Sequence, residues 1–247
     1  MNKEEVKVFI ESNKRQITDV NNFSRCVDGR YEDIQNMPLG AKPGGDVGDV
    51  MAAFGALNLL RKELEPQLVI DAALKLVGGE KNFNFHTDTH ADPSDVGLGC
   101  GHFKQAKLDP IAYGVTQEQM DYLANALPGL LKQGAQQEVL RGDHAEQAVV
   151  VVDSKDYGLL PLLRDGEDLK ETFVYQKTLH LKQLDSLANL LQETLASKGE
   201  VVESTDIRKA LEEAFGRQLT ETLKRLAEGL PLYVAKIGAD GQIDISE

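Results

Sequence analysis

The run Ala148-Val149-Val150-Val151-Val152 is the most strongly patterned stretch of this chain. Four β-branched residues follow an alanine without a polar residue between them, as is typical of a strand buried on both faces. Parallel sheets bury both faces of their strands under crossover helices, so the run predicts a central strand. Around it, apolar residues alternate between helical spacing and short buried runs. The sequence therefore predicts an α/β fold with a mainly parallel central sheet flanked by helices.

Start and stop signals place the other elements along the chain. Thr116 and Gln119 form a capping box, the pairing that opens a helix. Pro66 stands at another helix start, and Gly78 and Gly79 follow the end of that helix. Two helices with leucine stripes fill the C-terminal third and are expected to face the core. The predicted strands are 23–27, 82–86 and 148–152, and the predicted helices are 3–14, 47–60, 66–77 and 116–132. Of the two C-terminal helices, one carries Leu184 to Leu195 and ends near Gly199, and the other carries Ile207 to Leu226 and ends near Gly229.

Length and charge limit the class of protein and its partners. The chain has 247 residues, with 40 acidic and 27 basic side chains and a formal net charge of −13. This acidic balance disfavours nucleic acids and anionic membranes as partners. Residues 1–15 lack the apolar stretch of a signal peptide, and no window reaches the roughly 18 apolar residues of a membrane span. We expect a cytoplasmic protein with one domain over 1–247. Its motif-bearing core covers about 20–155, and the C-terminal helices and strand at 178–240 belong to the same domain.

The side chains that could carry chemistry are concentrated in two short segments. The first is Arg25-Cys26-Val27-Asp28-Gly29-Arg30, and the second runs from Phe85 to His102. Together they hold both cysteines, Cys26 and Cys100, and three of the five histidines. Both segments lie at predicted strand ends, where open parallel sheets place their sites. Two thiolates and an imidazole form a site for a thiophilic divalent ion such as zinc, with one coordination position left open.

Each of these residues also has a simpler explanation. Free cysteines are often core residues, and the two thiols could also form a disulfide. Asp28 and Arg30 could form a strand-end salt bridge of little energetic value. Alternatively, Asp28 could accept a hydrogen bond from a metal-bound water while Arg30 keeps it ionised. Gly44 and Gly45 by themselves predict only a turn.

Five segments carry a family resemblance. They are Cys-Val-Asp-Gly-Arg at 26–30, Lys-Pro-Gly-Gly at 42–45, His-Thr-Asp-Thr-His at 86–90, Leu-Gly-Cys-Gly-His-Phe at 98–103 and Gly-Asp-His at 142–144. In this order they resemble the zeta-class, cadmium-tolerant carbonic anhydrases and, more distantly, the beta class. The resemblance implies a beta-carbonic-anhydrase-like fold and a metal-dependent lyase, a carbonate dehydratase.

The resemblance also implies a set of metal ligands. Cys26, His86 and Cys100 would bind one divalent ion, with zinc as the first expectation and cadmium or cobalt as alternatives. His86 is preferred to His90 because it ends the predicted strand. The interval from His86 to Cys100 is longer than usual for the family, so a shorter one would begin at His90. Asp28 and Arg30 would be the catalytic pair beside the metal.

The implied reaction is the reversible hydration of carbon dioxide to bicarbonate by a metal-bound hydroxide, because the metal lowers the pKa of its water to about 7. Two alternatives stay open: a non-catalytic metal-binding module, and hydrolysis of another small electrophile such as carbon disulfide. Asp46 departs from the family, which tends to be apolar at this position. The further residues are Gly44, Gly45 and Asp46 in the substrate pocket, and His90, His102 and His144 as proton relays or, equally, as structural histidines.

Overall fold

The computed structural model describes most of the helices and strands of the chain. The described residues are 2–8, 11, 25–26, 41–88, 101–140, 147–153, 157–165, 168–171, 177–229, 232–237, 240 and 242–246. For several strand residues, Cys26 and His86 among them, the description covers the backbone alone. In the described part of the chain, no helix combines the length and the apolar character needed to cross a bilayer.

Helix α2 (Gly45–Leu60) is the central helix of the molecule, and every residue from Gly45 to Leu57 is buried. Its sequence is rich in small and apolar residues on all sides, and a helix of this kind packs on every face. Its neighbours are α7 (Ser204–Gly229), α3 (Pro66–Val77) and α4 (Gly101–Leu108). At Gly55 the approach to α7 is so close that an added Cβ would lie 2.9 Å from Ala214 Cβ.

The helix predictions that rest on local signals are confirmed. Helix α3 begins at Pro66 and is closed by Gly78, whose φ of 83° lies in the left-handed region. Helix α5 (Gln117–Lys132) follows the predicted capping box, with both reciprocal hydrogen bonds between Thr116 and Gln119 present. The two C-terminal helices are α6 (Lys177–Ser197) and α7. The described leucine-stripe residues of these two helices are in the core: Leu184, Leu187, Leu191, Leu195, Ile207, Leu211, Phe215 and Leu219.

The described strands form three separate sheets. Two are parallel pairs, in which β1 (Arg25–Cys26) joins β2 (Ala41–Lys42) and β3 (Asn84–Asp88) joins β4 (Gln136–Leu140). A short 3₁₀ turn (η2, Glu80–Asn82) precedes β3. The third sheet has the order β7-β6-β5-β8-β9. Its strands are β5 (Gln147–Asp153), β6 (Tyr157–Asp165), β7 (Asp168–Glu171), β8 (Leu232–Ile237) and β9 (Ile243–Ser246).

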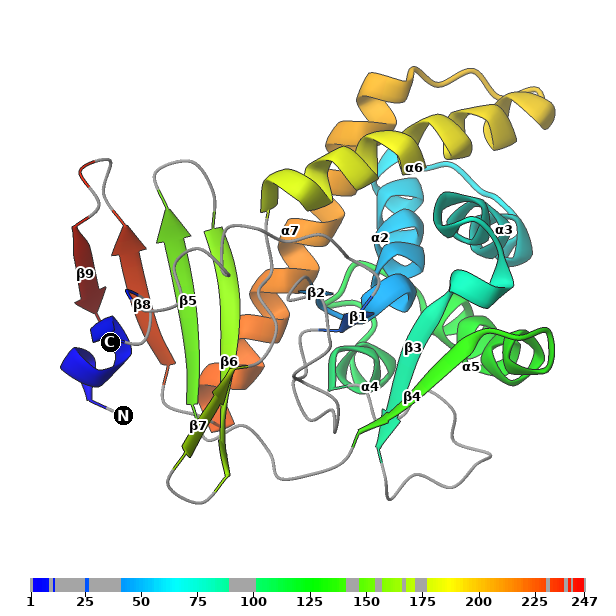
Figure 1. The fold of residues 1–247 in the computed structure, drawn as a ribbon. Helices are drawn as coiled ribbons and strands as arrows, with labels where there is room; N and C mark the ends of the chain where they lie inside the picture. Colours follow the sequence, from blue (N-terminus) through cyan, green and yellow to red (C-terminus); the bar gives the residue numbers. More distant parts are fainter. Residues whose placement is uncertain are drawn as a thin grey trace.

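The predicted fold class, a single mainly parallel central sheet flanked by helices and resembling that of beta-class carbonic anhydrases, is wrong. In the five-stranded sheet β5 is parallel to β8, but the other three pairings are antiparallel. This sheet lies at one side of the molecule, while α2, α3, α6 and α7 pack against one another (Figure 1). The valine run does occupy the middle strand, β5. An uninterrupted apolar strand suits the centre of a mixed sheet as well as that of a parallel one, which is why the pattern misled.

Candidate functional site

The turn between β2 and α2 contains two of the predicted pocket residues, Gly44 and Gly45. Gly44 and Gly45 adopt φ angles of 79° and 59°, in the left-handed region that favours glycine. At Gly44 a Cβ would also lie 2.7 Å from Cδ2 of His102, so the imidazole packs directly on the turn. The two glycines therefore allow the chain to turn sharply into α2 and allow α4 to approach it.

A buried ion cluster stands beside this turn. The Nζ of Lys42 lies 3.1 Å from Oδ1 of Asp46 and 2.5 Å from Oδ2 of Asp49, and none of the three residues is more than 1% exposed. A third hydrogen bond, 3.1 Å long, runs from Lys42 Nζ to Oε1 of Gln183 on α6. An ammonium group has three donors, so these contacts engage all of them.

The second carboxylate oxygen of Asp46 ties the cluster to β3. Oδ2 accepts a hydrogen bond of 2.8 Å from the backbone N–H of Asn84, the first residue of that strand. On the other side, Lys42 pairs in register with Cys26 of β1. The cluster is thus linked to both strands, to the one that ends at Cys26 through β2 and to the one that contains His86 through Asn84.

Burial and charge act in opposite directions on the two titrating partners. Burial lowers the pKa of Lys42, but the attraction of the Asp49 and Asp46 carboxylates outweighs it and raises that pKa above the usual 10.5. Burial raises the pKa of Asp46 from 3.8 to about 6, because the attraction of Lys42 only partly offsets it and the Asp49 carboxylate adds to it. With all three groups ionised, the cluster carries one net negative charge.

His102 is held by a hydrogen-bond chain from α7. Its Nδ1 lies 2.7 Å from Oγ1 of Thr222, and that hydroxyl donates its own proton to the carbonyl oxygen of Gln218 over 2.9 Å. Because a hydroxyl has one proton to give, Nδ1 of His102 must be the donor in this pair. The ring also lies edge-on to Tyr113, with centroids 5.4 Å apart. The hydrogen-bond network therefore assigns the Nδ1–H form of a buried histidine.

The structure brings the strands of two predicted metal ligands into contact, β1 with β3. Cys26 is the last residue of β1, and His86 is the third residue of β3, which continues to Asp88. The expectation that His86 ends its strand is therefore wrong, and the choice between His86 and His90 stays a prediction. Among the described residues no group of three His, Cys, Asp or Glu side chains is arranged to hold a metal ion. The predicted residues that lie outside the described ones are Asp28, Arg30, His90, Cys100 and His144.

The residues that complete the ion cluster were not predicted as site residues. Lys42 is predicted only as part of the Lys-Pro-Gly-Gly segment, and Asp49 and Gln183 are not predicted. A signal did exist. Asp46 and Asp49 are three residues apart, so they share one face of a helix whose other residues up to Leu57 are apolar or glycine. Acids in such a helix need a buried cation, and Lys42 stands four residues before the first of them.

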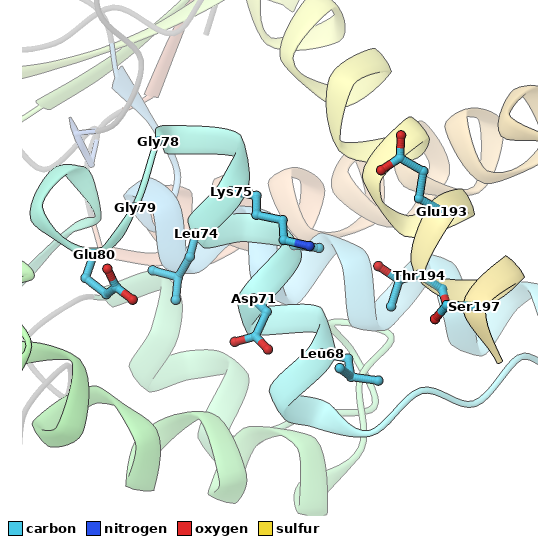
Figure 2. Close-up of a pocket in the computed structure, with 11 residues that line it drawn as sticks. Leu68, Asp71, Leu74, Lys75, Gly78, Gly79, Glu80, Glu193, Thr194 and Ser197 are labelled. Atoms are coloured by element: carbon cyan, nitrogen blue, oxygen red, sulfur yellow. The ribbon is translucent and has the colours of Figure 1, made fainter.

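A separate hollow of about 660 Å³ lies between α3 and α6, away from the turn and the ion cluster. Figure 2 shows Asp71, Glu80 and Glu193 at its wall together with one base, Lys75. The hydroxyl of Thr194 donates to a carbonyl oxygen one turn earlier in α6, so it is directed into its own helix. Nothing in this hollow indicates chemistry, and none of the predicted site residues lines it.

Comparison of the chain with protein-family models, with curated proteins and with solved structures finds no match.

Proposed function

We propose that this chain binds one divalent metal ion through Cys26, His86 and Cys100 and catalyses the reversible hydration of carbon dioxide to bicarbonate. The observation that carries the proposal is the buried Lys42–Asp46 ion pair, which joins the strands of Cys26 and His86 to one end of α2. The five motif segments that resemble zeta-class carbonic anhydrases support the same reading of these residues.

The donor set suits a thiophilic divalent ion. Two thiolates and an imidazole neutralise a dication and leave one coordination position for solvent or substrate. Lys42 is compensated by two carboxylates, so it adds no uncompensated positive charge beside Cys26 that would oppose a metal ion. Zinc is the first expectation, and cadmium and cobalt suit the same ligands. When bound, such an ion supplies Lewis-acid chemistry that makes a water molecule reactive at neutral pH.

The other roles belong to side chains of this protein. Asp28 would accept a hydrogen bond from the reacting water and so orient it toward the carbon of carbon dioxide, while Arg30 keeps Asp28 ionised. Gly44 and Gly45 would shape the substrate pocket through the sharp turn that they allow, with the imidazole of His102 packed on Gly44. Asp46 would lie behind this turn, since Lys42 engages its carboxylate. Because both thiols must be reduced, the proposal includes a cytoplasmic location.

Metal content of protein purified under reducing conditions is the first test. We expect about one equivalent of zinc per chain, since three protein ligands make one site. Cys26→Ser and Cys100→Ser should each lose the metal. The matched control is His180→Gln on α6, outside all five motif segments, which should retain it. Metal-free wild-type protein with a disulfide between the two cysteines would overturn the proposal.

Stopped-flow hydration of carbon dioxide is the second test. The wild-type protein and His180→Gln should accelerate hydration, and Asp28→Ala should lose the activity while keeping its metal. Metal-replete wild-type protein that leaves the uncatalysed rate unchanged would instead indicate a non-catalytic metal-binding module.

A further inference from the structure

We infer that Lys42 and Asp46 are positioning residues of the proposed metal site: through one buried ion pair they tie the strand ending at Cys26 to the first residue of the strand carrying His86, which it also contacts directly. This inference rests on the proposed function, because it gives those two strands the metal ligands.

The first step is the immobility of the ammonium group. A surface lysine samples many rotamers, but Lys42 is fully buried and its Nζ has acceptors on two helices, Asp46 and Asp49 on α2 and Gln183 on α6. Any displacement of Nζ lengthens at least one of these hydrogen bonds. The end of β2 is therefore fixed relative to both helices.

The second step is the connection between the ion pair and the two strands that carry the proposed ligands, β1 and β3. Lys42 lies opposite Cys26 in the β1–β2 pair, and paired strands are about 4.8 Å apart. Asp46 holds the N–H of Asn84, and His86 follows two residues later, at a rise of about 3.3 Å per residue. Each ligand backbone is thus joined to the ion pair over a short path, through Lys42 for Cys26 and through Asn84 for His86.

An electrostatic effect must be separated from a positioning effect. Removing the Asp46 charge would weaken the binding of any nearby cation even if no strand moved. Asp49→Asn removes a charge of the same sign from the same ammonium and leaves the Asp46–Asn84 hydrogen bond in place. It is therefore the matched control for charge.

The experiment loads the full-length protein with cobalt(II) and measures two quantities for each variant. These are the dissociation constant, by competition with a chelator, and the positions of the d–d absorption bands, which report ligand geometry. Asp46→Asn should weaken cobalt binding about 10- to 100-fold, as is usual when a residue that orients metal ligands is lost, and should shift the bands. Asp49→Asn should weaken binding less and leave the band positions unchanged.

A second variant keeps the inference testable if Asp46→Asn does not fold. Asn84→Pro removes the N–H donor but none of the charges. Proline is tolerated at the first position of a strand, and Phe83 before it is already extended, with φ of −73° and ψ of 122°. This variant should shift the cobalt bands in the same way as Asp46→Asn.

The outcomes distinguish the two proposals. Wild-type protein that binds no cobalt would overturn the proposed function and this inference with it. If wild-type protein binds cobalt and the Asp46 and Asn84 variants share its affinity and its spectrum, the metal site stands but the positioning role is wrong. If Asp46→Asn and Asp49→Asn weaken cobalt binding equally and shift no bands, Asp46 acts through its charge alone and the positioning role is wrong.

Discussion

At the scale of single residues, the raised pKa of Asp46 makes a prediction about stability. The pKa is about 6 in the folded chain and near 3.8 when exposed, so between these values the folded protein binds more protons than the unfolded one. Stability then falls as the pH rises through this window, and a shift of two units corresponds to about 3 kcal/mol. Between pH 4 and pH 7, the free energy of unfolding measured with urea should fall by about this amount more in the wild-type protein than in Asp46→Asn. Curves that stay parallel across the window would contradict the assigned shift.

Thr222 offers a second prediction at this scale. In Thr222→Val the buried Nδ1–H of His102 loses its acceptor, so the free energy of unfolding should fall by about 1–3 kcal/mol. Thr220→Val is a matched control, because Thr220 makes the same hydroxyl contact to the preceding helical turn but is exposed. Its effect should stay within about 0.5 kcal/mol. Chemical denaturation of both variants gives the comparison, and equal losses would mean that the bond to His102 contributes nothing.

These residues also mark how far the site could be predicted from the sequence. The turn at Gly44 and Gly45 can be predicted from these two residues alone, because few other residues adopt a positive φ. Lys42 and Gln183 meet across 141 positions of sequence, and no local pattern links them. Charged side chains are usually exposed, so a lysine and two acids beside a glycine turn suggest a solvated surface until the packing is known.

At the scale of helices and strands, the contact between α2 and α7 makes a third prediction. Gly55→Ala would place a methyl group 2.9 Å from Ala214 Cβ, so it should destabilise the protein by about 1–3 kcal/mol. Gly216→Ala, on the exposed side of α7 with no atom near its Cβ, should instead stabilise by about 1 kcal/mol. The midpoint of thermal unfolding should therefore fall in Gly55→Ala and rise in Gly216→Ala. A rise in both variants would contradict the close packing at Gly55.

The elements differ in how well the sequence predicts them. Helices α3 and α5 depend on signals within a few residues, Pro66 with Gly78 for one and Thr116 with Gln119 for the other, and their boundaries are correct. Strand pairing depends on segments far apart in the chain. Val149–Val152 indicates a central strand, but nothing in it identifies β8, some 80 residues later, as its parallel neighbour. The antiparallel neighbour of β5 is β6, and Pro161 within β6 makes that segment look less like a strand.

At the scale of the whole molecule, the proposed metal links binding to folding. An ion that binds the folded chain and not the unfolded one stabilises it by about 4 kcal/mol at a thousandfold excess over the dissociation constant. Adding zinc to chelator-treated protein should therefore raise its thermal midpoint. Cys26→Ser should show no such rise, and a rise of equal size in this variant would mean that the ion binds elsewhere.

The position of α2 also has a consequence for synthesis of the protein. The helix is complete by Leu60, but α7, against which it packs, begins only at Ser204. At ribosomal rates of about 5–20 residues per second, this interval is on the order of ten seconds. During that time the nascent chain presents an apolar helix without its covering partner. The order of synthesis therefore leaves the apolar surface of α2 open to chaperones or to other nascent chains until α7 has been made.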